Sequence, residues 1–266
     1  MSIMELFDSH AHYNDEKFSL DREEILQEIY NDGITKLVNA GYSLESSKLA
    51  LEIAKKHEWI YTISGISPND IPNNVNELKE QIYELERFIV NEKNTEKIVA
   101  IGEIGLDYYW NEDNVELQRK AFNEQIDLAN KQQLPVVIHT REAVMDTIKI
   151  LRENEVLKKG VFHCCPLNRE LVKEALKLGF YISFAGPITF KNSKNANEII
   201  EMVPLEKILI ETDSPYLSPE PNRGKRNDSR NVKFIAQKIA EVKKTSLDDI
   251  AMTTYKNACQ IFKLTK

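Results

Sequence analysis

The sequence contains few cysteines and no long apolar segment. Its 266 residues include only Cys164, Cys165 and Cys259, too few to predict a disulfide framework, and a low cysteine content favours a reducing cytoplasm. No apolar run reaches the roughly 18 residues that a membrane span requires. The first residues, MSIMELFDSHAHY, lack a basic region followed by an apolar stretch. We therefore expect a cytoplasmic protein with no signal peptide and no membrane partner.

An excess of positive charge is also missing. The chain has 35 Lys and Arg against 42 Asp and Glu, which gives a formal net charge of −7. This balance excludes a protein that coats nucleic acid through bulk charge, but it leaves open an enzyme that meets phosphate groups with metal ions. Hydrophobic residues make up 42% of the chain, which is ordinary for a globular protein and excludes a disordered one.

Short β-branched runs alternate with longer amphipathic segments along the chain. A helix is predicted at 116–131, where Leu117, Phe122, Ile126 and Leu128 recur at near-helical spacing. Continuous apolar strands that alternate with helices predict a parallel sheet buried on both faces. The predicted strands span residues 3–7, 36–40, 60–64, 98–102, 135–138, 160–162, 180–185 and 208–211.

Eight strand–helix units in a chain of this length predict an α/β fold, a single (β/α)8 TIM barrel, with an open doubly wound sheet as the alternative. We expect one domain that spans residues 1–266. A closing C-terminal helix is predicted at 246–264, with Ser246 as its N-cap and Asp248 and Asp249 in its first turn.

Four of the five histidines follow predicted strands. His10 and His12 come after the first strand, His139 after the fifth and His163 after the sixth. His57 lies between a helix and a strand and is expected at the surface. A lone histidine is more often a satisfied core or surface residue than a ligand. Four histidines in one structural position point instead to the C-terminal face of the barrel, where the active sites of such barrels lie.

Alternation along the strands adds carboxylates to this set. Asp8, His10 and His12 would share one face of the first strand, so that two imidazoles converge on one ion. The same alternation brings Glu103 to the end of the fourth strand and Asp213 to a position after the eighth. We expect Asp8 to orient a histidine from behind. The candidate metal ligands are therefore His10, His12, Glu103, His139, His163 and Asp213.

Four imidazoles and two carboxylates exceed what one tetrahedral ion uses, which predicts two divalent ions bridged by Glu103. Nitrogen and oxygen ligands suit Mg, Mn or Zn. Each residue alone has an ordinary alternative. The two histidines of the first motif could be polar residues of a loop, Glu103 could pair with a lysine, and Asp213 could start a turn.

Basic and aromatic residues near these strand ends are candidates for binding the substrate. Arg141 follows His139 by two positions and is a candidate phosphate contact. An aromatic segment at 108–110 could stack on unpaired bases or pack beneath a long loop. The loop after the eighth strand is either a phosphate site or a solvated basic loop, and it carries Arg223, Lys225, Arg226 and Arg230.

Five motifs carry a resemblance to a known family. DSHAH, GEIGLDYY, HTR, FHC and ETDSPYL, in this order and along roughly the whole chain, closely resemble the TatD family of metal-dependent deoxyribonucleases. The resemblance implies a barrel with a two-metal site that hydrolyses phosphodiester bonds in DNA, typically with magnesium or manganese. The family positions that match the six candidate ligands are metal ligands.

The sequence departs from the family pattern around the substrate. The family usually has a G-x-H-P motif whose histidine is associated with holding the substrate phosphate, and here Ser67 takes that place. A serine donates a hydrogen bond but carries no charge. The motif after the sixth strand reads Cys164-Cys165-Pro166-Leu167 in place of the usual C-F-S-G. The metal site is therefore expected to be retained, while the substrate contacts differ.

These observations predict a metal-dependent hydrolase, a deoxyribonuclease of the 3′–5′ exonuclease type on single-stranded DNA, with no obligate protein partner. Asp213 is expected to accept a proton as well as bind metal, and Glu103 to bridge. The predicted substrate contacts are Ser67, Arg141, Arg223 and Arg226. One alternative is an amidohydrolase-type enzyme that acts on an amide, an ester or an aminoacyl-tRNA bond, because a metal-activated water also attacks carbonyl carbon. Another is a non-catalytic metal-binding or scaffolding relative.

Overall fold

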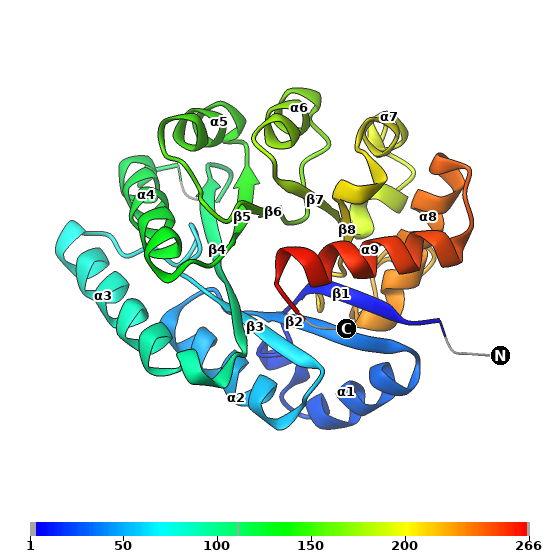
Figure 1. Ribbon diagram of the computed structural model, residues 1–266, viewed down its shortest axis with the longest axis horizontal. Coiled ribbons are helices and arrows are strands. Elements are labelled where there is room, and N and C mark those ends of the chain that lie inside the picture. The colour runs from blue at the N-terminus through cyan, green and yellow to red at the C-terminus, as the bar shows by residue number, and fades with distance from the viewer. Residues whose placement is uncertain (1–3, 111, 265–266) are drawn as a thin grey trace.

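The computed structural model describes residues 4–110 and 112–264, in which strands and helices alternate (Figure 1). The strands are β1 Leu6–Ala11, β2 Ile34–Ala40, β3 Ile60–Ser64, β4 Ile98–Asp107, β5 Val136–Arg141, β6 Gly160–Phe162, β7 Tyr181–Phe184 and β8 Ile208–Ile210. The α-helices are α1 Arg22–Asn31, α2 Leu44–Lys56, α3 Val75–Asn91, α4 Val115–Gln132, α5 Val144–Glu153, α6 Arg169–Lys177, α7 Ala196–Met202, α8 Val232–Lys243 and α9 Leu247–Ile261. Short 3₁₀-helices lie at Glu16–Phe18, Lys93–Thr95, Gly186–Thr189, Leu205–Lys207 and Ser229–Asn231.

The eight strands form one parallel sheet in the order of the sequence, from β1 to β8. Two backbone hydrogen bonds bring its ends together. Asp213 N–H donates to the His10 carbonyl at 2.9 Å, and His12 N–H donates to the Ser214 carbonyl at 2.6 Å. The sheet is thus a nearly closed barrel surrounded by helices, which confirms the predicted TIM-barrel-like fold and excludes an open doubly wound sheet.

The barrel interior is apolar at the end where the strands begin. Every strand contributes at least one buried side chain to a common cluster, which includes Phe7, Val38, Ile63, Val99, Val137, Val161, Tyr181 and Leu209. Branched and aromatic side chains fill an eight-stranded barrel of this kind as a packed core. A larger apolar cluster lies between the strands and the surrounding helices. The strands are therefore buried on both faces, as predicted.

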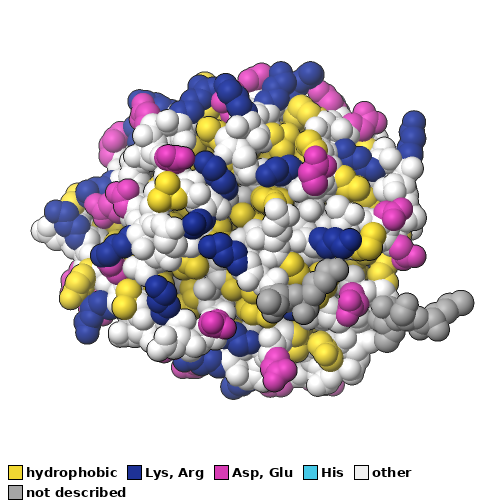
Figure 2. Space-filling view, viewed as in Figure 1, with side chains coloured by type: hydrophobic (Ala, Val, Ile, Leu, Met, Phe, Trp, Pro, Cys, Tyr) yellow, Lys and Arg dark blue, Asp and Glu magenta, His cyan; other side chains and the backbone are white. Residues whose placement is uncertain are grey.

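The last helix closes this apolar end. Ala258, Cys259, Ile261 and Phe262 belong to the same cluster as the inward side chains of the strands. Ser246 caps α9 as predicted, because its hydroxyl accepts a hydrogen bond from Asp249 N–H at 3.0 Å. Figure 1 shows α9 across the barrel, and the same view in Figure 2 shows basic and acidic side chains interspersed over this face.

Side-chain caps help to set where the helices begin. Ser43, Asn74 and Asn168 each accept a hydrogen bond from a backbone N–H in the first turn of α2, α3 and α6. Such caps typically stabilise a helix by about 0.5–2 kcal/mol. The helix predicted at 116–131 is confirmed as α4. No helix among the described residues combines the length and the apolar composition that crossing a membrane requires. One domain over residues 1–266 stays a prediction.

Several strand boundaries differ from the prediction: β5, expected at 135–138, continues to Arg141 and includes His139, and the differences are largest at the first and fourth strands. The first strand was expected at 3–7, partly outside the described residues, whereas β1 runs from Leu6 to Ala11 and includes His10. The fourth strand was expected to end at residue 102, whereas β4 continues to Asp107 and includes Glu103. Both strands continue through polar residues, because the backbones of these residues pair with β2 and β5 in the barrel wall. A prediction that ends a strand at its first polar side chains therefore places these two ends too early.

Candidate metal centre

The predicted ligands meet at the C-terminal end of the barrel in two adjoining groups. In the first group, His10 Nε2 lies 3.3 Å from His12 Nε2. Asp213 Oδ1 lies 3.2 Å from His12 Nε2 and 3.8 Å from His10 Nε2. The backbone hydrogen bond from Asp213 to His10 that joins the ends of the sheet therefore also brings this carboxylate to the two imidazoles.

The second group consists of Glu103, His139 and His163. His139 Nδ1 lies 3.1 Å from His163 Nε2, and Glu103 Oε1 lies 2.6 Å from His163 Nε2. Glu103 also faces the first group, because its Oε1 is 3.9 Å from His10 Nε2 and its Oε2 is 3.9 Å from His12 Nε2. The Glu103 carboxylate thus stands between two sets of imidazoles, the central position expected from the sequence.

Strict alternation of side chains does not explain this convergence. The pairing of β1 with β2 changes register between Asp8 and Ala11, and the pairing of β4 with β5 changes register between Ile101 and Ile104. The alternation predicted for these strands is therefore interrupted at the positions of His10 and Glu103. Asp213 does not continue β8 either, because it sits in a turn with φ of 56°.

Asp107 fixes the ring of His139. Asp107 Oδ2 lies 2.9 Å from His139 Nε2, and Oδ1 accepts hydrogen bonds from the backbone N–H groups of Tyr109 and Trp110 at 3.0 Å each. A carboxylate behind a ligand imidazole sets its tautomer and its orientation. Asp107 is not among the residues predicted from the sequence, because the fourth strand was expected to end at residue 102; its place in the GEIGLDYY motif was the available signal.

Glu211 lies behind His163 in a similar place, although the two side chains form no hydrogen bond. Glu211 Oε1 lies 3.4 Å from His163 Nδ1 and accepts a hydrogen bond from Cys164 N–H at 2.5 Å. Asp8 was expected to orient a histidine ring, but its carboxylate accepts hydrogen bonds from His10 N–H at 3.3 Å and from Thr212. Asp8 therefore holds backbone rather than an imidazole, and burial raises its pKa to about 7.

Burial and mutual attraction compete throughout the cluster. Burial raises the pKa of Glu103, but the neighbouring imidazoles, that of His163 first, hold it well below its ordinary value. Burial lowers the pKa of His163, but Glu103 and Glu211 raise it well above its ordinary value. Burial and the positive charge of His163 hold the pKa of His10 well below its ordinary value. Carboxylates that hold protons on imidazoles offer a site where a cation can replace those protons.

The residues present fit a divalent cation. Three groups have nitrogen and oxygen atoms that all lie within 4.8 Å of one another, namely His10, His12 and Asp213; Glu103, His139 and His163; and His10, His163 and Glu211. Among the described residues, His10 Nδ1 and Glu211 Oε2 are buried without a hydrogen-bond partner. Mixed imidazole and carboxylate donors suit zinc, manganese or magnesium. His57 stands apart, 3.1 Å from Glu23 near the surface.

A pocket of about 400 Å³ opens over the cluster, and it includes two of the four predicted substrate residues. Ser67 and Arg141 line this pocket, whereas Arg223 and Arg226 are not among its lining residues. Arg226 donates hydrogen bonds to both carboxylate oxygens of Asp21. The guanidinium of Arg223 lies 4.2 Å from the ring centre of Phe190. The predicted basic loop therefore makes contacts within the protein rather than along the pocket.

Ser67 reaches the pocket with its hydroxyl already engaged. Its Oγ donates a hydrogen bond to Asp70 Oδ2 at 2.6 Å and accepts one from Asn69 N–H at 3.3 Å. In this arrangement the hydroxyl proton faces Asp70, so it is not presented to a phosphate oxygen. Arg141 is exposed, and its charge has no carboxylate partner within 4–110 and 112–264.

Known proteins resemble this chain along nearly its whole length. The profile of the family described as TatD related DNase matches residues 7–263. The chain is 38% identical over 260 residues to the metal-dependent hydrolase YabD of Bacillus subtilis, covering 97% of this chain and 99% of that protein. The crystal structure of YjjV, a TatD homologue of Escherichia coli K12, superposes with a TM-score of 0.91 at 25% identity, covering 99% of this chain and all of that one. A TatD family hydrolase of Entamoeba histolytica superposes with a TM-score of 0.86 at 25% identity, over 99% of this chain and all of that one.

The TIM-barrel-like fold, the buried histidine–carboxylate groups at its C-terminal end and the similarity to YabD identify the class as metal-dependent hydrolases. Within that class, the profile match over nearly the whole sequence and the similarity to YabD decide the family. The chain belongs to the TatD family.

Proposed function

We propose that the chain is a deoxyribonuclease that removes nucleotides from single-stranded DNA in the 3′–5′ direction. The position of Glu103 carries the proposal, because its Oε1 lies 2.6 Å from His163 Nε2 while its Oε2 faces His12 at 3.9 Å. A carboxylate shared by two cations about 3.5–4 Å apart is common in enzymes that displace groups at phosphorus. The family description, TatD related DNase, supports DNA as the substrate.

The proposed ligands follow the two groups of side chains. His10, His12 and Asp213 would hold one divalent cation, His139 and His163 the other, and Glu103 both. The bound cations would be Mg, Mn or Zn, which polarise the phosphoryl group and lower the pKa of a water molecule. No protein partner is needed for this reaction. A cytoplasmic location is also proposed, and the free thiols of Cys164 and Cys165 agree with it.

The side chains themselves contribute positioning and proton transfer. Asp213 accepts the proton of the attacking water. A carboxylate at the edge of the cluster can then pass this proton to solvent. Asp107 and Glu211 keep His139 and His163 in the orientation that their neighbours require. Arg141 offers a planar set of N–H donors to the oxygens of the phosphate.

Digestion of end-labelled single-stranded DNA with Mg²⁺ or Mn²⁺ tests this function. Wild type should shorten a 5′-labelled strand stepwise from its 3′ end, and EDTA should stop the reaction. Glu103→Gln should lose bound metal and activity together. Glu124→Gln, on the outer helix α4, is the matched control and should behave as wild type.

Other outcomes of this experiment would revise the proposal. A ladder obtained only from a 3′-labelled strand would reverse the proposed direction. With metal demonstrably bound, failure to cleave any DNA would reject the nuclease, and hydrolysis of an amide or an ester would then select a carbonyl substrate.

A further inference from the structure

Two exposed aromatic rings line the pocket above the metal centre and are not used by the mechanism. Trp110 follows β4 and is 64% exposed, and Tyr216 follows β8 and is 44% exposed. Strands β4 and β8 are four places apart in the eight-stranded order and lie on opposite sides of the barrel (Figure 1). The two rings therefore flank the cluster from opposite sides of the pocket mouth.

Trp110 is anchored through its backbone and Tyr216 through its hydroxyl. The backbone N–H groups of Tyr109 and Trp110 both donate to Asp107, the carboxylate that fixes His139. On the other side, the Tyr216 hydroxyl donates to Asp15 Oδ2 at 2.6 Å. The backbone of Trp110 is thus tied to a carboxylate of the site and the Tyr216 ring to Asp15, although much of the surface of both rings is left open to solvent.

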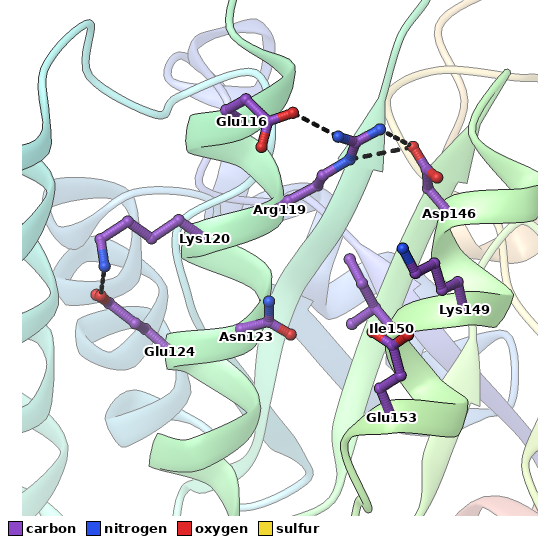
Figure 3. Close-up of a pocket in the computed structure, with 9 residues that line it drawn as sticks. All are labelled: Glu116, Arg119, Lys120, Asn123, Glu124, Asp146, Lys149, Ile150 and Glu153. Carbon is purple, nitrogen blue, oxygen red and sulfur yellow. Dashed lines mark hydrogen bonds and ion pairs between the residues drawn. The ribbon is translucent and has the colours of Figure 1, made fainter.

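Tyr108, the first of the three aromatic residues at 108–110, anchors this segment to the protein. The Tyr108 hydroxyl donates to Asp146 Oδ2 at 2.7 Å. Figure 3 shows Arg119 between Glu116 and Asp146 in the groove between α4 and α5. The charged side chains along this groove pair with one another, Arg119 with Glu116 and Asp146, and Lys120 with Glu124. Packing beneath a loop, the alternative for the aromatic segment, therefore describes Tyr108 but not Trp110.

A cation accompanies each side of the pocket mouth. The Arg141 guanidinium lies 3.8 Å from the ring centre of Tyr109 and 5.4 Å from that of Trp110. Lys17 Nζ lies 4.1 Å from the ring centre of Tyr216. Within the part of the chain that the structure describes, neither cation forms an ion pair with a carboxylate. Aromatic faces beside free cations suit unpaired bases and the phosphates that join them.

We propose that Trp110 and Tyr216 are stacking platforms for the bases on the two sides of the scissile phosphate, with Arg141 and Lys17 against the flanking phosphates. The inference rests on the proposed nuclease function and extends it. Bases in a duplex are stacked on one another and paired, so they present no free face to these rings. The platforms therefore select single-stranded DNA or a frayed end.

Tryptophan fluorescence tests the platform without any turnover. The chain has two tryptophans, so Trp59→Phe leaves Trp110 as the reporter. In EDTA, an oligothymidylate should quench Trp110, and an abasic deoxyribose-phosphate oligomer of equal length and charge should quench it far less. Equal quenching by the two oligomers would overturn the proposal, because phosphate contacts alone would then account for binding.

Binding of a labelled oligothymidylate, measured by anisotropy in EDTA, tests both rings. Trp110→Ala and Tyr216→Ala should each weaken binding by about 5- to 150-fold, the range for one stacked base. Tyr216→Phe keeps the ring but loses the hydrogen bond to Asp15, so it should bind much closer to wild type than Tyr216→Ala does. Tyr83→Ala is the matched control, because Tyr83 is 59% exposed on α3 and has Arg87 5.7 Å from its ring centre.

Thermal melts should show that these surface variants are folded. Unchanged binding by folded Trp110→Ala and Tyr216→Ala would overturn the inference even if wild type degrades DNA. With metal present, the KM for single-stranded DNA should rise in both variants while kcat changes little. If wild type binds oligothymidylate through Trp110 but cleaves no DNA, the proposed function fails and the platform stands.

Discussion

The two ends of the barrel are built from the same strands and carry opposite kinds of side chain. Val137 and Val161 pack against the residues of α9, and two positions later His139 and His163 meet Glu103. At the first end burial stabilises the fold. At the second end burial costs free energy that only mutual pairing or a cation offsets. The comparison teaches that stability and chemistry are separated along the direction of the strands.

A substitution at the polar end should affect catalysis most. Asp213→Asn should lower kcat by about 10²- to 10⁴-fold, because it removes the proposed proton acceptor. The free energy of unfolding should change little, since asparagine tolerates the positive φ of 56° at this position. Turnover at equal metal content and urea denaturation check both parts. Wild-type turnover in this variant would remove Asp213 from the mechanism.

A substitution at the apolar end should do the reverse. Phe262 is 3% exposed and its ring centre lies 6.3 Å from that of Phe7 inside the barrel. Phe262→Ala should reduce the free energy of unfolding by about 3–5 kcal/mol, because it leaves a cavity in the closed end. Turnover at a temperature where the variant is folded should stay near wild type. Leu20→Ala, at a side chain that is 99% exposed, is the control.

At the polar end, a carboxylate behind a ligand imidazole should have a smaller effect than a ligand itself. Asp107→Asn should weaken metal binding by about 10- to 100-fold, because His139 loses the partner that sets its tautomer. Calorimetric titration with Mn²⁺ measures this effect. Asp127→Asn, on the exposed side of α4, should titrate as wild type. Equal affinities in the two variants would show that the orientation of His139 does not depend on Asp107.

Substitutions of two arginines should distinguish a residue that contacts substrate in the pocket from one that contacts only the protein itself. Arg141→Ala should raise the KM for DNA by about 10- to 150-fold, in line with about 1.5–3 kcal/mol for a hydrogen bond to a charged group. Arg226→Ala should leave KM unchanged and cost under about 1 kcal/mol of stability, because it removes a partly exposed pair with Asp21. A rise in KM for Arg226→Ala would extend the binding surface to this loop.

Much of the architecture was predictable because the pattern is repeated. Short apolar runs with a histidine after them occur at several strands, and a parallel barrel brings all of those strand ends to one face. The sequence pattern alone therefore places His139 and His163 together, although they are 24 positions apart. The N-cap of α9 at Ser246 was predictable for another reason, since a cap depends on residues only three positions apart.

Other features depend on contacts that no local pattern contains. The changes of register near His10 and Glu103 arise from pairing with neighbouring strands. The pair between Arg226 and Asp21 joins positions 205 apart, so its arginine looked available for substrate. Ser67 looked like a donor because the competing acceptor, Asp70, is recognised only once the loop has folded.

The contact between the first and last strands also sets how much of the chain must be synthesised before the centre can form. Asp213 N–H reaches back to the His10 carbonyl across 203 positions of the chain, and α9 seals the far end only after that. A nascent chain on the ribosome carries His10 and His12 early, but it lacks Asp213 until β8 has been made. The metal centre of the hydrolase therefore cannot form until most of the chain has been translated.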